Sequence, residues 1–459
     1  MSSNMLADPT TSIESQSRER DQPGILGWAI VLGFCALLIF AILAFGAVDE
    51  WSTFTFEAGA ALLFLLWAAK QLLSQQVRLS NNPLYLPTGL FFGLILAQIL
   101  LRRSAYGYVT KYEALQYVSY GMMLFIAAEC LTAESSRKRF AQIMSIFGFA
   151  YALFAVVQAL TPNGKIFWIH TSHFPSATVF GSYVNHNHFA GVMEMLTPIP
   201  FVVSMGHLLQ GGKRALAGFC AGVMATTIFL SGSRGGMIAF ICQSVVFMAL
   251  AFGKKRSPRL AMGSVAVCVF ILALLFFLDQ GQALAHLGDL NPDIRLDITK
   301  DSLKMFSHRP VLGWGLGTFP TIYPRYRSFY TNLFINEAHN DYAQLLVEMG
   351  TLGFVLMLWF LVSLYRHGLP TSRSWEFRWD WGVSLAALLG CTGILVHSFV
   401  DFNLQITANA ALFYSLCGLA ASKPLETVSR RKRSRSIQEE ESAARRHLSD
   451  HGEPLEWSK

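Results

Sequence analysis

A histidine at the entrance of an apolar helix is the residue of this chain best suited to proton transfer. His339 lies in the polar segment 337–341 (EAHND), and an apolar helical sequence beginning at Tyr342 follows it directly. Histidine titrates near neutral pH, which makes it the usual general base for activating a hydroxyl group. Asn340 or Asp341 could orient the imidazole. A second interpretation, in which this polar segment only caps the helix, fits the same residues.

Two arginines could bind an anion beside such a base. Arg234 stands in the tight turn 230–236 (LSGSRGG), where small neighbours allow close backbone approach, and guanidinium suits bidentate phosphate binding. The alternative is that Arg234 only extends to lipid headgroups. Arg295 alone would be a solvated surface charge, but a diphosphate group requires a second cation. Arg309 is a further candidate for ligand binding.

The segment 181–191 (GSYVNHNHFAG) places more polar side chains where an apolar helix begins. Asn185, His186 and His188 could line a sugar-binding cleft. A His-x-His pair without a carboxylate at suitable spacing is weak evidence for a metal ion, so we expect no metal site and no cofactor. The seven cysteines lie in or beside apolar segments without a CxxC spacing, which supports neither disulfides nor zinc. The glycines of 313–317 are not predicted to form a phosphate loop, since no strand precedes them.

The composition indicates what kind of protein must hold these residues. The chain has 459 residues, of which 53% are hydrophobic and 14% charged, and its mean hydropathy is +0.40. These values exclude an ordinary soluble enzyme and favour an all-α polytopic membrane protein. A membrane span needs about 20 apolar residues. We predict twelve spans, at 26–47, 54–73, 84–101, 112–131, 141–160, 184–206, 214–231, 236–252, 260–278, 341–365, 381–399 and 406–421.

The distribution of basic residues predicts the orientation of these spans. With the N-terminus inside, the short inner loops hold fourteen Lys and Arg residues and the short outer loops hold five. Such a bias places both termini in the cytoplasm. The net charge of +7 then reflects topology and contact with anionic lipid headgroups, and it gives no argument for nucleic acid as a partner.

Three regions follow from the polarity along the chain. Residues 1–24 and 423–459 are polar and are predicted to be disordered cytoplasmic tails, and residues 25–422 form one membrane domain. Between the ninth and tenth spans lies a large outer loop, 279–340. Within it, Asn291-Pro292 predicts a helix start, and the helix should end before Pro310. We therefore expect the loop to be partly helical and folded on the membrane surface.

Four segments together resemble the O-antigen ligase and O-antigen polymerase superfamily of bacterial membrane glycosyltransferases. They are 183–191 (YVNHNHFAG), 231–236 (SGSRGG), Arg295 followed by 308–319 (HRPVLGWGLGTF), and 338–350 (AHNDYAQLLVEMG). The resemblance covers roughly residues 180–360, and the motifs do not separate ligases from polymerases. The first segment typifies a subset of the superfamily with poorly defined acceptors, so transfer to lipid A core does not follow from it.

The resemblance implies a metal-independent, inverting transfer of a glycan from undecaprenyl pyrophosphate to an acceptor hydroxyl. The reaction would take place at the outer face of the bacterial inner membrane, in lipopolysaccharide or surface polysaccharide biosynthesis. Arg234 and Arg295 match the family's pyrophosphate-binding arginines, and His339 matches its proposed base. The partners would be the lipid-linked glycan donor, a glycan or lipid acceptor, and membrane lipids. Alternatives are a repeat-unit polymerase, a protein O-oligosaccharyltransferase and a transporter of lipid-linked sugar; the last would require charged residues deep inside several spans.

Overall fold

The structure is a computed structural model that describes residues 23–75, 77, 79–171, 179–252, 292–332, 334–369 and 376–422. The predicted ninth span, the first part of the large loop and the two predicted tails, apart from residues 23 and 24, lie outside the described residues. Most of the described chain is helical, with one short antiparallel hairpin of β1 (Lys165–Ile166) and β2 (His170–Thr171).

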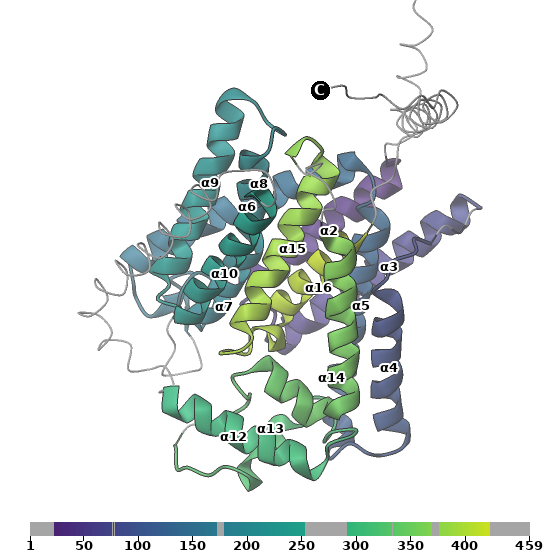
Figure 1. Ribbon diagram of the computed structural model, residues 1–459, viewed down its shortest axis with the longest axis vertical. Coiled ribbons are helices and arrows are strands. Elements are labelled where there is room, and N and C mark those ends of the chain that lie inside the picture. Colours follow the sequence, from purple (N-terminus) through teal and green to yellow (C-terminus); the bar gives the residue numbers. More distant parts are fainter. Residues whose placement is uncertain are drawn as a thin grey trace, which may run out of the picture.

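Helices that form the bundle come from both sides of the large loop (Figure 1). Before the loop they are α2 (Ile25–Leu43), α3 (Glu50–Leu73), α4 (Tyr85–Leu100), α5 (Gly107–Cys130), α6 (Glu134–Leu160), α7 (His186–Leu196), α8 (Pro198–Met205), α9 (Gly211–Leu230) and α10 (Arg234–Phe252). After the loop they are α14 (Asp341–Gly368), α15 (Trp379–His397) and α16 (Thr407–Ala421), with the short 3-10 helix η4 (Asn403–Gln405) between the last two.

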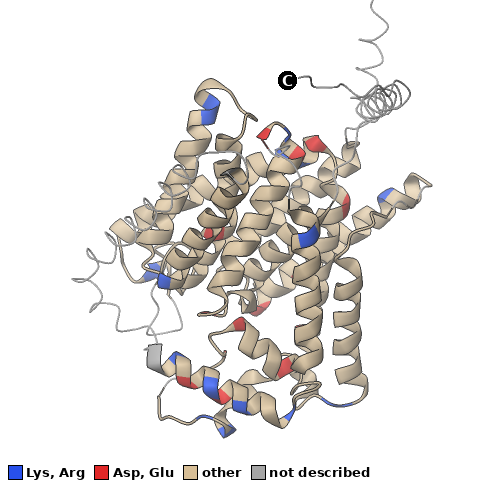
Figure 2. Ribbon diagram, viewed as in Figure 1, with Lys and Arg blue, Asp and Glu red and all other residues tan. Residues whose placement is uncertain are grey.

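Eight helical segments of the described chain are long and apolar enough to cross a membrane, and α4 and α16 are shorter apolar helices. The prediction of an all-helical fold with many membrane-length apolar helices is therefore confirmed, whereas the described residues do not establish twelve spans. Figure 2 shows that charged positions gather on α12 and at the ends of the bundle, with few along the middle of the helices.

Two segments occupy the centre of the bundle. In the candidate span formed by α7 and α8, 89% of the residues of its apolar stretch are buried inside the protein. In α15 the buried share is 83%, and in the other six candidate spans it is 22–44%. The α7–α8 segment is the predicted sixth span, which carries polar residues. A polar side chain in a membrane protein is tolerated where it faces other helices and not lipid. These two central segments can therefore hold titratable groups next to one another.

The described part of the large loop, 292–332 and 334–340, folds into a cap across one end of the bundle (Figure 1). It contains α12 (Pro292–His308), α13 (Phe319–Ile322) and the 3-10 helix η2 (Tyr323–Arg325). The helix α12 begins at Pro292, as the sequence predicted. A small apolar core that includes Ile298, Met305 and Phe319 holds the cap together.

A break in α14 attaches the cap to the bundle. Gly350 has φ +64°, a left-handed conformation that glycine adopts without strain, and it interrupts the helix. The carbonyls of Val347 and Glu348 accept hydrogen bonds from the backbone N–H groups of Trp314 and Gly315, at 2.9 and 3.0 Å. In the other direction, the N–H groups of 351 and 352 donate to the carbonyls of 310 and 311. The glycine-rich segment 313–317 thus docks on the broken helix.

Candidate functional site

The turn between α15 and α16, residues 398–406, brings residues from distant parts of the chain together. Its Asp401 side chain is only 1% exposed, yet it lies between two basic groups from the cap. One Asp401 oxygen is 3.7 Å from Nη1 of Arg295, and the other is 3.9 Å from Nδ1 of His339. Arg295 also donates a hydrogen bond of 2.7 Å from Nη1 to the carbonyl of Val400. Two of the predicted site residues therefore meet at a carboxylate that sequence reasoning had not singled out.

The electrostatics of Asp401 favour its ionised form. Burial by itself raises the pKa of Asp401, but nearby basic side chains outweigh burial and lower the pKa to about 2. Those side chains are His188, Arg295, His339 and His397. Asp401 is consequently a permanent negative charge at any physiological pH.

His339 is held in an unusual backbone conformation. Its φ is +50°, in the left-handed region that non-glycine residues seldom adopt. Such outliers persist where the surroundings fix them, and they concentrate at functional sites. The side chain is 12% exposed, and its ring meets the ring of Phe402 edge-on, with centroids 4.7 Å apart. Phe402 also contacts the ring of His188 edge-on at 4.7 Å, so one aromatic residue separates the two histidines.

The two residues after His339 make other contacts that fix the backbone around it. Asn340 is the N-cap of α14, and its side-chain oxygen accepts hydrogen bonds from the N–H groups of Tyr342 and Ala343. Asp341 accepts hydrogen bonds from the Ser398 hydroxyl at 2.7 Å and from the backbone of Leu404 at 3.2 Å. Both side chains are engaged in fixing α14 and the 398–406 turn, while Asp401 faces the imidazole.

The Asn-His-Asn-His segment is more enclosed than expected. Asn185 caps α7 by accepting a hydrogen bond of 2.8 Å from the Asn187 N–H group. His186 and His188 are 4% and 5% exposed, and Nδ1 of His188 lies 3.4 Å from the side-chain oxygen of Asn403. An open sugar-binding mouth formed by these residues is therefore not what the structure shows. Of the three, His188 contacts the 398–406 turn, through Asn403 and Phe402.

Arg234 is the first residue of α10 and is exposed. The small residue after it, Gly235, allows the backbone of α10 to approach the end of α15 closely. A Cβ atom on Gly235 would lie 2.6 Å from the His397 ring and 2.8 Å from the Val400 side chain. Since Arg295 donates to the Val400 carbonyl, both predicted anion-binding arginines lie beside the start of the 398–406 turn.

Arg309 lies elsewhere. It donates a hydrogen bond of 3.0 Å to the Arg103 carbonyl, and its guanidinium carbon is 4.3 Å from the centre of the Trp314 ring. It thereby joins the far end of α12 to the segment that follows α4. The prediction that Arg309 is a candidate for ligand binding finds no support in this placement.

The described residues contain no group of three or more His, Cys, Asp or Glu side chains that could hold a metal ion. Six of the seven cysteines are among them, and all six are free thiols.

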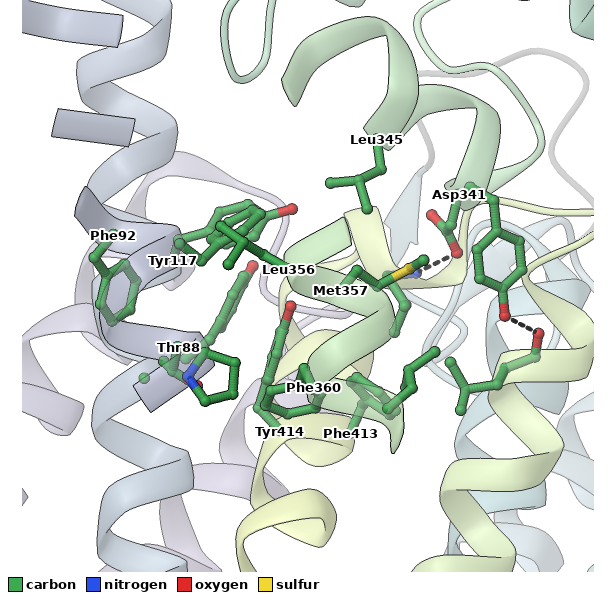
Figure 3. Close-up of a pocket in the computed structure, with 18 of the residues that line it drawn as sticks. Thr88, Phe92, Tyr117, Asp341, Leu345, Leu356, Met357, Phe360, Phe413 and Tyr414 are labelled. Carbon is green, nitrogen blue, oxygen red and sulfur yellow. Dashed lines mark hydrogen bonds between the residues drawn. The ribbon is translucent and has the colours of Figure 1, made fainter. Parts of the chain in front are cut away.

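An apolar cavity opens among α4, α5, α14, α15 and α16 (Figure 3). Aromatic side chains that include Tyr117, Phe360 and Tyr414 surround it. Asp341 and Gln405 belong to its lining, and they are also linked to one another at 3.4 Å. The cavity thus reaches from the bundle interior to the turn that carries Asp401.

Sequence reasoning missed Asp401, Phe402, Glu194 and His397. A usable signal was present in 397–403 (HSFVDFN), where a histidine and an aspartate follow a strongly apolar segment at the predicted outer face. Polar and titratable residues at a span end are functional candidates by the same argument that selected Arg234.

The comparison with protein families agrees with the resemblance carried by the motifs. Residues 219–358 match the family model described as O-antigen ligase. The match runs from α9 into α14 and contains Arg234, Arg295 and His339, whereas Asp401 lies beyond it. No curated protein matches the chain. The chain therefore carries an O-antigen ligase domain in residues 219–358, within a helical fold that has several apolar helices long enough to cross a membrane.

Proposed function

We propose that this protein transfers a glycan from undecaprenyl pyrophosphate to an acceptor hydroxyl at the outer face of the inner membrane. The observation that carries the proposal is the convergence of His339, Arg295 and Asp401 on one turn below the cap. These are a base, a cation and an orienting carboxylate, and they come from three separate elements.

The proposed reaction is an inverting displacement without a metal ion. The acceptor oxygen attacks the anomeric carbon, its proton passes to His339, and the bond between that carbon and the pyrophosphate oxygen breaks. Asp401 faces Nδ1 of His339 at 3.9 Å, where its negative charge would stabilise the imidazolium that forms when His339 takes the proton. Hydrogen bonds of this kind are often long before substrate binds.

Arg234 and Arg295 would neutralise the leaving pyrophosphate. Nε of Arg295 is buried and makes no hydrogen bond with the described residues, so it has a donor to offer to a ligand. Arg234 begins α10, and the positive end of a helix dipole favours a phosphate oxygen. Together they provide the separated cations that a diphosphate requires.

The apolar cavity beside Asp341 suits a lipid substrate. Its lining comes from helices of the membrane bundle, and its outer residues belong to the same turn as Asp401. A hydrocarbon chain bound there would keep the polar end of the lipid at the site.

Reconstitution of the purified protein in vesicles with a lipid-linked glycan donor tests the reaction class. A transferase releases undecaprenyl pyrophosphate, and the acceptor that gains the glycan separates the alternatives. Glycan on a second lipid indicates a ligase, longer chains on the carrier lipid indicate a polymerase, and glycan on protein indicates an O-oligosaccharyltransferase. Movement of donor across the bilayer without pyrophosphate release would contradict the proposal and favour a transporter.

His339→Ala is expected to lower the transfer rate by about 10²- to 10⁴-fold, the usual contribution of a general base, while the protein still folds. The matched control is His308→Ala, because His308 is an exposed histidine at the end of α12. It should retain the activity of the unmodified protein. Near-normal transfer by folded His339→Ala would contradict the assignment of the base.

A further inference from the structure

A buried carboxyl–imidazole pair lies beneath the site and is not used in the chemistry proposed above. Oε1 of Glu194 in α7 and Nδ1 of His397 at the end of α15 are 2.8 Å apart. Their side chains are 0% and 1% exposed. Ionisable groups inside a membrane bundle are costly and are retained mainly where they serve function. The pair belongs to the two central segments of the bundle.

The second ring nitrogen of His397 faces the start of α10. Nε2 of His397 is 3.5 Å from the hydroxyl of Ser233. That hydroxyl accepts a hydrogen bond of 3.1 Å from the Gly236 N–H group, so Ser233 caps the helix that begins with Arg234. A Cβ atom on Gly235 would lie only 2.6 Å from the ring. The imidazole is therefore packed directly against the turn that carries Arg234.

The backbone of His397 holds the other half of the site. Its carbonyl accepts hydrogen bonds from the N–H groups of Val400 and Asp401, at 3.0 and 3.2 Å. One residue thus contacts the α10 start through its side chain and the Asp401 turn through its main chain. Figure 1 shows α7, α10 and α15 side by side in the bundle, and α15 contacts both of the others.

We propose that Glu194, His397 and Ser233 form a positioning unit that fixes Arg234 relative to the Asp401–His339 pair. This inference rests on the proposed function, in which Arg234 binds the leaving group and His339 takes the proton. Without the unit, both groups remain present but are misaligned. A displacement of about 1 Å from productive geometry costs about a hundredfold in rate, so kcat should fall while KM for the donor changes little.

Two replacements of His397 separate its two contacts. The amide nitrogen of asparagine takes the place of Nδ1 and can reach Glu194, and that of glutamine takes the place of Nε2 and can reach Ser233. His397→Asn and Ser233→Ala, which both lose the link to α10, should lower kcat by about tenfold or more. His397→Gln should retain more activity than His397→Asn.

Ser384→Ala is the matched control. Ser384 is also on α15, and its buried hydroxyl accepts a hydrogen bond of 2.6 Å from Arg137 near the other end of the helix. Its replacement should lower thermal stability and leave kcat per folded molecule unchanged. The measurements are kcat and KM for the lipid-linked donor, with the folded fraction taken from thermal unfolding of the purified full-length protein.

Ser233→Ala and His397→Asn with the kcat and KM of the unmodified protein would overturn the positioning unit. Losses that only follow the folded fraction, as for Ser384→Ala, would overturn it as well. His339→Ala distinguishes the two proposals. If His339→Ala is inactive and Ser233→Ala is normal, the positioning unit alone fails. If His339→Ala is active, the proposed function fails.

Discussion

Two arginines of this protein show opposite patterns of hydrogen bonding. Arg137, near the start of α6 and far from the cap, is completely buried. Its guanidinium donates to three backbone carbonyls and two hydroxyls, which belong to Leu131, Asp380, Ser384 and Ser422. Arg295 donates one hydrogen bond, to the Val400 carbonyl, and its buried Nε makes none with the described residues.

The difference separates a structural arginine from one that is ready for a ligand. A guanidinium group has five N–H donors, and a buried donor without an acceptor is unfavourable. Arg137 makes five hydrogen bonds and joins α6 to α15 and to the residue after α16. Arg295 keeps N–H donors that make no hydrogen bond with the described residues, beside a buried carboxylate and a histidine. An anionic substrate would accept hydrogen bonds from these donors.

Replacing each of these arginines by alanine should affect different properties. Arg295→Ala should mainly lower the transfer rate, and Arg137→Ala should mainly lower stability. Arg295→Ala is expected to lower the transfer rate by about 10²- to 10³-fold, as for the loss of one donor to a developing charge. It should lower stability less than Arg137→Ala does, although the buried Asp401 loses one of its basic neighbours. Arg137→Ala should destabilise the protein by about 3 kcal/mol or more, because several buried acceptors lose their donor. Transfer assays and thermal unfolding of both variants provide the measurement. A destabilised Arg295→Ala with normal turnover per folded molecule would mean that Arg295 is also structural.

Asp401→Asn sharpens the comparison at the carboxylate. It keeps the shape of the side chain but removes the charge that faces Arg295 and His339. We therefore expect transfer to fall, by up to the roughly 10⁴-fold that the same replacement costs in a Ser-His-Asp triad. Asp341→Asn is the contrasting variant, because the Asp341 side chain accepts hydrogen bonds from Ser398 and Leu404 of the 398–406 turn. An unchanged rate for folded Asp401→Asn would rule out the orienting role.

The pKa of Asp401 also predicts a pH dependence. Its pKa is lowered from 3.8 to about 2 in the folded protein. A group with a lowered pKa stabilises the folded state fully above its ordinary pKa, and this contribution is lost as pH falls toward the folded value. Unfolding measurements should therefore show a loss of stability between about pH 4 and pH 2 that is smaller in Asp401→Asn. Equal acid sensitivity of both proteins would contradict the ionised state.

The smallest effect is expected at Arg309. Its exposed guanidinium lies over Trp314, a contact that contributes about 0.5–1 kcal/mol at such sites. Arg309→Ala should lower the stability of the protein by about that amount and leave the transfer rate unchanged. A large loss of transfer would show that a third arginine, in addition to Arg234 and Arg295, binds substrate.

Much of the fold could be predicted from local signals. Long apolar segments predict membrane helices because the backbone must satisfy its own hydrogen bonds in lipid, and the proline at 292 predicted where α12 begins. The break in α14 at Gly350 was not predictable in this way. It depends on the docking of residues 310–315, which lie about 40 residues earlier in the chain.

The candidate site was predictable only in part. Arg234, Arg295 and His339 could be selected because their residue types stand out against apolar or polar surroundings. Asp401 could not be paired with His339, because that pairing depends on how the turn after α15 meets the cap. The prediction that Asn340 or Asp341 orients the histidine used only their proximity in sequence. At the start of a helix, however, Asn and Asp side chains also form hydrogen bonds with backbone N–H groups, and this capping role competes with any other.

The docking of the cap on the broken helix determines how substrates can enter. A movement of the cap away from the bundle would break the four backbone hydrogen bonds that join residues 310–315 to residues 347–352. At about 0.5–1.5 kcal/mol each, these bonds alone make such an opening cost about 2–6 kcal/mol, and the open state would be populated at a few per cent or less. We therefore expect lipid substrates to enter the site from the bilayer, by lateral diffusion between helices, while the cap stays docked on the bundle.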